Sequence, residues 1–394
     1  MDTYTNSQPV FVRSCTEYDE HTIFTAIADA LSALGTSPSE LFHRRNVLIK
    51  PNLVMAKRPD AAATTHPAFV RAVARLAAEY GAASVVVADS PGGPFNEAYV
   101  SAVYSTCGMN AAANDGLFTL NHDFSFSEVH FPSGRKLRNA DLINVFLRAD
   151  IIIDLCRLKT HSLTGMSCAV KNLFGLIPGV KKFQMHASFP QIDDFSEMLV
   201  DLAEYVTSSK VFLAVADAIV SMEGNGPSHG VPKLTGLILV SRSPFALDII
   251  GEHIMFDKSS TDVPYLDASA KRRIVPRDWR SIEVVGDTDY DTYDFVLPDS
   301  TSGSFLRGLP DIFGGRLADM FGARPSVNEK KCVGCGRCAD SCPKHTIRLG
   351  RRGEHGKRVA FILRDDCIKC YCCQELCPIG AVETKQNPLI RLIH

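Results

Sequence analysis

Long apolar runs are missing from this sequence of 394 residues. A membrane-spanning helix needs roughly 18 or more consecutive apolar residues, and no window of the chain provides them. Residues 1–14 also lack a basic stretch followed by an apolar one, which is the pattern of a secretory signal. We therefore expect a cytoplasmic protein with no membrane contact.

Nucleotide-binding loops and a large excess of charge are also missing. Neither a GxGxxG nor a Walker A sequence occurs, so a dinucleotide or P-loop site is not indicated. The formal net charge is only −2, which does not predict nucleic acid as a partner. The charge is uneven, because residues 326–394 hold 13 Lys and Arg against 7 Asp and Glu.

The chain has 13 cysteines, and nine of them lie between Cys332 and Cys377. In a chain without an export signal, such a group indicates metal binding rather than a disulfide framework. Two runs of the form CxxCxxCxxxCP are present, and this doubled spacing is typical of bacterial ferredoxins with two [4Fe–4S] clusters. The predicted ligands are Cys332, Cys335, Cys338, Cys342, Cys367, Cys370, Cys373 and Cys377.

The fourth cysteine of each run is expected to bind the cluster of the other run. Cluster I would use Cys332, Cys335, Cys338 and Cys377, and cluster II would use Cys367, Cys370, Cys373 and Cys342. A zinc site is the alternative, but zinc favours four ligands arranged as two pairs. Cys372 lies between ligands of cluster II and is interpreted as a bystander.

Buried-type strands alternate with amphipathic helices in the first 298 residues. This order predicts an α/β fold with a largely parallel sheet flanked by helices. Residues 327–394 are expected to add a small α+β bacterial-ferredoxin-like domain. The predicted strands cover 46–50, 84–89, 150–155, 211–220, 236–241 and 281–285, the helices 67–80, 94–107, 191–206 and 244–256, and a hairpin 126–137.

Residues 299–326 are rich in Gly and Pro and are predicted to be a linker between the two domains, with one short helix near Leu317. In the second domain, the stretch between the two cysteine runs is longer than a ferredoxin needs. It contains a polar hairpin at 350–357, which we expect to contact a partner protein.

Polar residues follow several predicted strands of the α/β domain. Ligands of open parallel sheets bind beyond the carboxyl ends of the strands, where these residues would meet. The catalytic candidates are His161, Lys171 and Glu223. The candidates for binding a cofactor are Asn52, Asp89, Gly92, Gly93, Lys159, Asn172, His186 and Asn225.

Each candidate also has a structural interpretation. Asp89 to Gly93 contains the usual turn formers, and a single histidine such as His161 is often a hydrogen-bonded core residue. Glu223 is equally suited to capping a Gly-rich loop. Lys171 lies in an apolar segment, where an unpaired lysine is costly, which favours a ligand-binding role. Lys181 and Lys182 are expected to be solvated, whereas Asp248 is expected to be buried and hydrogen-bonded.

The segments VLIKPNLV, VVVADSPGG, CRLKTHSLTGMSCAVKNLFGLIPG and VADAIVSMEGNGP resemble the DUF362 family over roughly residues 46–255. Members similar to this chain often carry a two-cluster ferredoxin tail. The resemblance therefore implies the architecture, while the name of the family records no function.

A weaker resemblance links the chain to lactate racemase (LarA-like) enzymes. It rests on Lys159 to His161, Gly165, Lys171, Pro178-Gly179 and His186, which occur in a similar order. The resemblance implies acid/base chemistry at His161, a cofactor anchor at Lys171 and a metal or cofactor ligand at His186. Residues 65–67 and 89–91 depart from the racemase pattern, so the resemblance indicates where a site lies rather than its reaction.

These observations predict an iron–sulfur oxidoreductase. Its two [4Fe–4S] clusters would deliver electrons to a small, anionic substrate or cofactor in a polar cleft of the α/β domain. A redox partner protein or electron carrier would reduce the clusters. Two alternatives remain: an electron-transfer adaptor for another enzyme, and a non-redox isomerase with structural clusters. The identity of any additional cofactor in the cleft is not indicated by the sequence.

Overall fold

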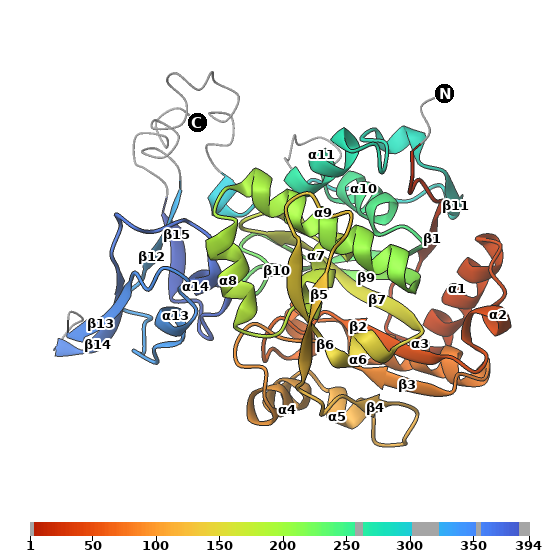
Figure 1. The fold of residues 1–394 in the computed structure, drawn as a ribbon, viewed down its shortest axis with the longest axis horizontal. Coiled ribbons are helices and arrows are strands. Elements are labelled where there is room, and N and C mark those ends of the chain that lie inside the picture. The colour runs from red at the N-terminus through yellow and green to blue at the C-terminus, as the bar shows by residue number, and fades with distance from the viewer. Residues whose placement is uncertain (1–3, 257–262, 302–322, 352–355, 386–394) are drawn as a thin grey trace.

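The computed structural model describes residues 4–256, 263–301, 323–351 and 356–385. In these residues nine strands form one large sheet (Figure 1). Its order is β11 (Val284–Gly286), β1 (Val10–Ser14), β10 (Val231–Ser241), β9 (Val211–Glu223), β7 (Ile151–His161), β2 (Asn46–Pro51), β3 (Ser84–Val87) and β4 (Thr119–Leu120), with β8 (Gly165–Ser167) beside the end of β7.

Parallel pairing dominates this sheet, as predicted. Strands β9, β7, β2, β3 and β4 are parallel neighbours. Strand β10 pairs antiparallel with both β9 and β1, and β8 pairs antiparallel with β7. A separate hairpin, β5 (Phe126–His130) and β6 (Asn139–Ile143), turns close to the predicted position.

Helices cover both faces of the sheet and bury two apolar cores. Successive residues of β7 alternate between them, with Ile152 in one core and Ile151 and Ile153 in the other. One face carries α1 (Glu20–Ala33), α2 (Pro38–Phe42), α3 (Pro67–Glu79), α4 (Glu97–Thr106) and α5 (Met109–Ala112). The other carries α6 (Asn144–Arg148), α7 (Ala169–Asn172), α9 (Ile192–Ser209), α10 (Pro244–Met255) and α11 (Pro264–Lys271).

Local capping explains where the helices begin. His66 caps α3 and Ser243 caps α10, each followed by a proline in the first turn, where its missing N–H costs nothing. Helix α4 starts later than predicted because Asn96 accepts the N–H of Tyr99. Four short 3₁₀ turns complete this part: η1 (Pro59–Ala61), η2 (Leu173–Leu176), η3 (Trp279–Ser281) and η4 (Asp299–Thr301).

Three strands are clearly longer than predicted, and one of them, β10, begins five residues earlier, at Val231. Strand β7 continues through Lys159 to His161, and β9 continues to Glu223. The extension of β7 is held on one side by β8, which pairs His161 with Gly165, and on the other by β9 after a register shift. The predicted position of Lys159 and His161 beyond the strand was therefore wrong. Polar residues extend this strand because both of its edges are hydrogen-bonded there.

The C-terminal residues form a small α+β domain, as predicted. Strand β12 (Arg324–Val327) pairs with β15 (Val382–Lys385), and β13 (Ile347–Arg351) pairs with β14 (Arg358–Ile362). Two short helices, α13 (Arg337–Asp340) and α14 (Cys372–Glu375), contact each other. Figure 1 shows this domain beside α8 (Lys181–Ser188). The helix predicted near Leu317 lies outside the described residues, and the limits 298 and 327 of the two domains stay predictions.

Candidate functional site

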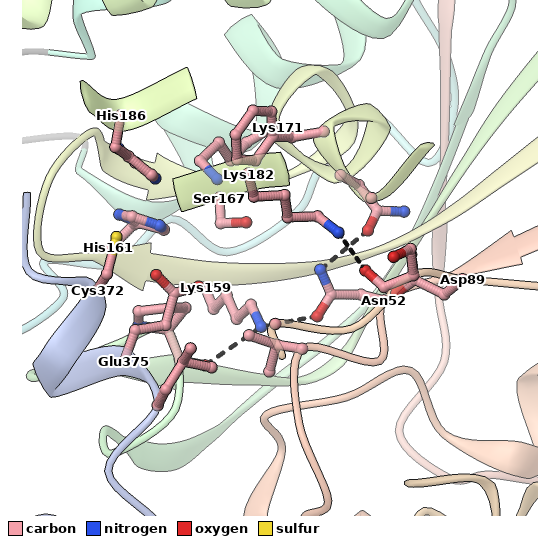
Figure 2. Close-up of a pocket in the computed structure, with 18 of the residues that line it drawn as sticks. Asn52, Asp89, Lys159, His161, Ser167, Lys171, Lys182, His186, Cys372 and Glu375 are labelled. Carbon is pink, nitrogen blue, oxygen red and sulfur yellow. Dashed lines mark hydrogen bonds between the residues drawn. The ribbon is translucent and has the colours of Figure 1, made fainter. Parts of the chain in front are cut away.

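A cavity of about 60 Å³ lies where the α/β domain meets α14. Its walls come from β7, from α7 and α8, and from the loops after β2 and β3. Cys372 and Glu375 close it from the ferredoxin side (Figure 2), together with Leu376. Eight of the predicted site residues line it: Asn52, Asp89, Gly92, Lys159, His161, Lys171, Asn172 and His186.

Two glycines at the rim have structural reasons to be glycine. A Cβ on Gly92 would lie 2.5 Å from Cδ2 of Leu376, so this position permits the close contact between the domains. Gly93 has a φ of +138°, and a Cβ there would lie 2.6 Å from the ring of Tyr99. Gly93 is not among the residues that line the cavity.

A hydrogen-bonded network forms the floor of the cavity. Lys50 Nζ donates to Asp89 Oδ1 at 2.8 Å and to Asn172 Oδ1 at 3.3 Å. The amide of Asn52 donates to the same oxygen of Asn172 at 2.9 Å, and its own oxygen accepts from Lys159 Nζ at 2.8 Å. Sequence reasoning missed Lys50, although a lysine inside the apolar strand VLIKP was a signal. Asn52, Asp89, Lys159 and Asn172, which were predicted to bind a cofactor, therefore form hydrogen bonds within this network of protein side chains.

Two buried lysines of the pocket donate to oxygens of the protein. Lys159 Nζ also donates to the carbonyls of Ala63 and Pro227, which gives it three acceptors. Lys182 was expected to be solvated, and this was wrong: it is buried and donates to the carbonyls of Ser90 and Ile177. Helix α8 folds it back into the pocket. Burial lowers the pKa of each lysine to about 7.

The lowered pKa of Lys182 predicts a change of stability with pH. Below pH 7 the folded and unfolded states both hold the proton. Between about 7 and the ordinary 10.5 only the unfolded state holds it, so stability rises with pH. Each such group contributes up to about 1.4 kcal/mol per pH unit. We expect Lys182→Met to lower the pH slope of the unfolding free energy between pH 7.5 and 9.5, measured anaerobically with urea. An unchanged slope would contradict a buried, neutralised Lys182.

Among the described residues, Lys171 and His161 have polar side-chain atoms without a hydrogen-bond partner. Lys171 is 8% exposed and its Nζ lies 4.5 Å from the ring centroid of Phe174, without a hydrogen-bond acceptor in the described part of the chain. His161 is 3% exposed, and within the described residues its Nε2 has no partner. Figure 2 shows both side chains directed into the cavity. These are the two groups best placed to bind a ligand.

His186 lies beside them on α8. Its ring stacks on Phe195 with centroids 4.4 Å apart. Burial, and then the charge of Lys171, lower its pKa to about 3, so the ring is neutral at physiological pH. A neutral imidazole next to an ammonium suits either ligand binding or coordination.

Two predicted residues lie elsewhere. Glu223 accepts from Lys233 Nζ at 2.8 Å and from the N–H of Val296 at 3.1 Å. Asn225 donates to Asp299 Oδ2 at 2.9 Å. Both side chains hold residues 296–299 against the end of β9. The structure does not bring Glu223 or Asn225 to the pocket that contains His161.

Cys372, which was interpreted as a bystander among the ligand cysteines, lies in the wall of the cavity. It is buried and lines the cavity, and Figure 2 shows its sulfur on the side of the pocket where His161 lies. Its spacing still excludes it from the ligand pattern. Local sequence could not reveal this position, because the opposing wall comes from the other domain.

Electrostatic influences relate the predicted ligand cysteines to one another, although no group of three or more metal-ligand side chains is found among the described residues. Burial and then the charges of Cys377, Cys332 and Cys335 raise the pKa of the Cys338 thiol to about 11. These are the four members predicted for cluster I. The thiol of Cys373 has Cys370, Cys367 and Cys342 among its charged neighbours, as predicted for cluster II, together with Cys338.

Backbone groups also favour thiolates at these positions. The N–H groups of Ala360, Thr346 and Ala381 donate to the sulfurs of Cys332, Cys342 and Cys377 at 3.4, 3.3 and 3.1 Å. None of the 13 cysteines is in a disulfide. Because no metal-holding group is found among the described residues, the eight cysteines stay predicted ligands. Hydrogen bonds of this kind would tune the potential of bound clusters.

Comparisons with known proteins agree with both parts of the chain. The family described as "Domain of unknown function (DUF362)" matches residues 47–252, and the "4Fe-4S dicluster domain" family matches residues 331–381. The C-terminal domain is therefore a 4Fe–4S dicluster domain. Within the described residues, no helix is both long and apolar enough to span a membrane.

Individual relatives match one part or the other. A thylakoid-associated protein of Synechocystis is 33% identical over 59% of this chain and 70% of its own length. An uncharacterised ferredoxin of Methanocaldococcus jannaschii is 39% identical over 15% of this chain and 74% of its own length. The lactate racemase apoprotein of Thermoanaerobacterium thermosaccharolyticum is 14% identical with a TM-score of 0.39, covering 62% of this chain. This chain spans 56% of that structure.

Proposed function

Because this chain belongs to the DUF362 family, a domain of unknown function, we propose its function from the pocket itself: it is an iron–sulfur oxidoreductase that acts on a small anionic molecule bound between its two domains. When bound, the clusters supply single electrons. The residues of the pocket hold the molecule, orient it and exclude water.

One observation carries the proposal. Helix α14 begins at Cys372 and contains Cys373, a proposed ligand of cluster II, and the same helix lines the pocket through Cys372 and Glu375. The pocket and the cluster site are thus separated by the backbone of one short helix. This arrangement supports the hypothesis that the clusters deliver electrons to a bound molecule. It does not favour the alternative, an adaptor that only docks another enzyme.

The charge of the pocket favours an anion. Lys159, Lys171 and Lys182 line it, and the carboxylates on its walls are Asp89 and Glu375. Asp89 is paired with Lys50. Lys159 Nζ donates to three protein oxygens and is not available to bind a ligand directly, and with its pKa lowered to about 7 it contributes only part of a charge at neutral pH. Lys171 has no such acceptor in the described residues and is available for direct contact with a ligand. An unpaired buried charge is costly, and a bound anion would offset that cost.

The size of the cavity limits the ligand. A volume of about 60 Å³ corresponds to a few water-sized positions, at roughly 10 to 15 Å³ each. Phe174, Phe183 and Leu376 form the apolar part of the wall. We therefore propose a small carboxylate-type substrate, or the anionic end of a larger molecule that reaches in from the rim.

Electrons must reach the clusters from an external carrier. Strands β13 and β14 carry the exposed residues Arg348, Arg351 and Arg358. We propose that this basic surface docks an acidic electron carrier, as predicted for the polar hairpin. Opposite charges would speed the encounter at low ionic strength.

The test is oxidation of the reduced protein by small anions. Anaerobic holoprotein is reduced with a limiting amount of dithionite, and carboxylates, oxo acids and their neutral amides are added one at a time. We expect at least one anion, and none of the amides, to restore the visible absorbance of the oxidised clusters. If no small molecule does so while a protein partner does, the adaptor interpretation is correct and this proposal is wrong.

A further inference from the structure

The two ring nitrogens of His161 have different surroundings. Its Nδ1 accepts the backbone N–H of Leu163 at 3.1 Å and that of Thr164 at 3.4 Å. A backbone N–H only donates, so Nδ1 carries no proton. The neutral ring must then carry its single proton on Nε2. His161 is thereby fixed in one tautomer by the turn that follows β7.

The other face of the ring is directed into the pocket. Nε2 is buried without a partner in the described residues, and an unsatisfied buried donor costs roughly 1 to 3 kcal/mol. Doubly protonated imidazole is disfavoured, because its Nδ1–H would face two further N–H groups. Burial, and then the charges of Lys171 and Lys159, hold the pKa of His161 well below its usual 6.5.

These contacts exclude a role for His161 as a proton acceptor in the pocket. Nε2 already carries a proton and cannot accept another, and Nδ1 is occupied by the backbone. What the ring offers the pocket is one N–H, in the same cavity that Lys171 lines (Figure 2). Preorganised donors of this kind stabilise negative charge on oxygen.

We propose that His161 is a permanently neutral N–H donor which, together with Lys171, binds one negatively charged oxygen of the substrate. This inference rests on the proposed function and deepens it. It identifies the ligand as an acceptor-only oxyanion such as a carboxylate, and it replaces the acid/base role that the racemase resemblance implied for His161.

The probe is acetate, with acetamide as its neutral counterpart of similar size. Binding to oxidised holoprotein is measured by isothermal titration calorimetry under anaerobic conditions. His161→Gln keeps an N–H near the position of Nε2 but cannot titrate, whereas His161→Phe keeps a ring and removes the donor. We expect acetate affinity within about threefold of wild type for His161→Gln and at least roughly tenfold weaker for His161→Phe. Acetamide should bind at least tenfold more weakly than acetate.

The pH dependence supplies a second readout. Lys159, Lys171, His186, Cys372 and Glu375 also line the pocket, so the affinity itself will vary with pH. The ratio of the wild-type affinity to that of His161→Gln removes these shared contributions. We expect this ratio to stay constant from pH 5.5 to 8.5. A ratio that changes with a midpoint near 6.5 would show that protonated His161 binds the anion and would overturn the proposal.

Other outcomes separate this inference from the proposed function. If His161→Phe binds acetate like wild type while Lys171→Met does not, the anion site stands and the role of His161 is wrong. If wild-type protein binds acetamide as well as acetate, the oxyanion assignment is wrong. In both cases oxidation of the reduced protein by a small anion, measured separately, still decides the proposed function.

Discussion

Replacing Cys373 by serine is expected to lower the iron content of the anaerobically purified protein from roughly eight to about four atoms per chain. Replacing its neighbour Cys372 by serine should leave the content unchanged. The two side chains are both buried and adjacent on α14, so the pair is closely matched. Both lie near Cys370, but Cys373 also has Cys367 and Cys342 among its neighbours, while Cys372 lines the pocket.

Iron and acid-labile sulfide analysis, together with visible absorbance, measures this outcome. Equal loss of iron in the two variants would mean that α14 unfolds as a whole, and circular dichroism of the α/β domain would show whether the change is local. Full iron content in Cys373→Ser would contradict its assignment as a ligand. About two zinc atoms with little iron in wild-type protein would contradict the clusters themselves.

Replacing Lys171 by methionine is expected to slow anion-dependent oxidation of the reduced protein by about a hundredfold or more. A fully desolvated ammonium bound to a charged oxygen contributes more than an ordinary hydrogen bond, of the order of 1.5 to 3 kcal/mol, and its loss also leaves the anion facing an apolar wall. Iron content should not change. Stability should be equal or higher, because the variant no longer buries an ammonium that lacks a hydrogen-bond acceptor in the described residues.

Lys181→Met is the matched control. Lys181 lies in the neighbouring α8 and pairs with Asp141 at 3.0 Å, with its side chain 37% exposed. It does not line the pocket. Its variant should oxidise at the wild-type rate. Equal loss of activity in the two variants would indicate a general effect of positive charge on the domain, and wild-type rates in Lys171→Met would place the reaction outside this pocket.

The sequence was informative where chemistry fixes the spacing of residues. Four sulfurs around a small cluster require closely spaced cysteines, so both ligand runs could be read from the sequence, and the dicluster match confirms the domain. The buried strand 150–155 was predicted from its apolar residues alone. Its extension to His161 was not, because the pairing of β8 with Lys159 and His161 depends on a turn made later in the chain.

The site was predictable in part for the same reason. Lys171 stood out as a charge in an apolar segment, and it lies in the pocket. Lys182 looked like an ordinary surface lysine, since nothing nearby in sequence shows that α8 folds back over Ser90. Cys372 looked surplus because its pocket is completed by the other domain. Contacts between distant segments decide these cases, and hydrophobic periodicity does not record them.

The contact between Gly92 and Leu376 has a consequence for the maturation of the protein. Leu376, Cys372 and Glu375 belong to a segment flanked by proposed cluster ligands, and metal binding and folding are coupled in such small domains. If the clusters bind as proposed, the last wall of the pocket is built by a part of the chain that folds around iron and sulfide. A newly made chain would then present an open, cationic groove until its clusters were inserted, so that the pocket would be completed only in the holoprotein.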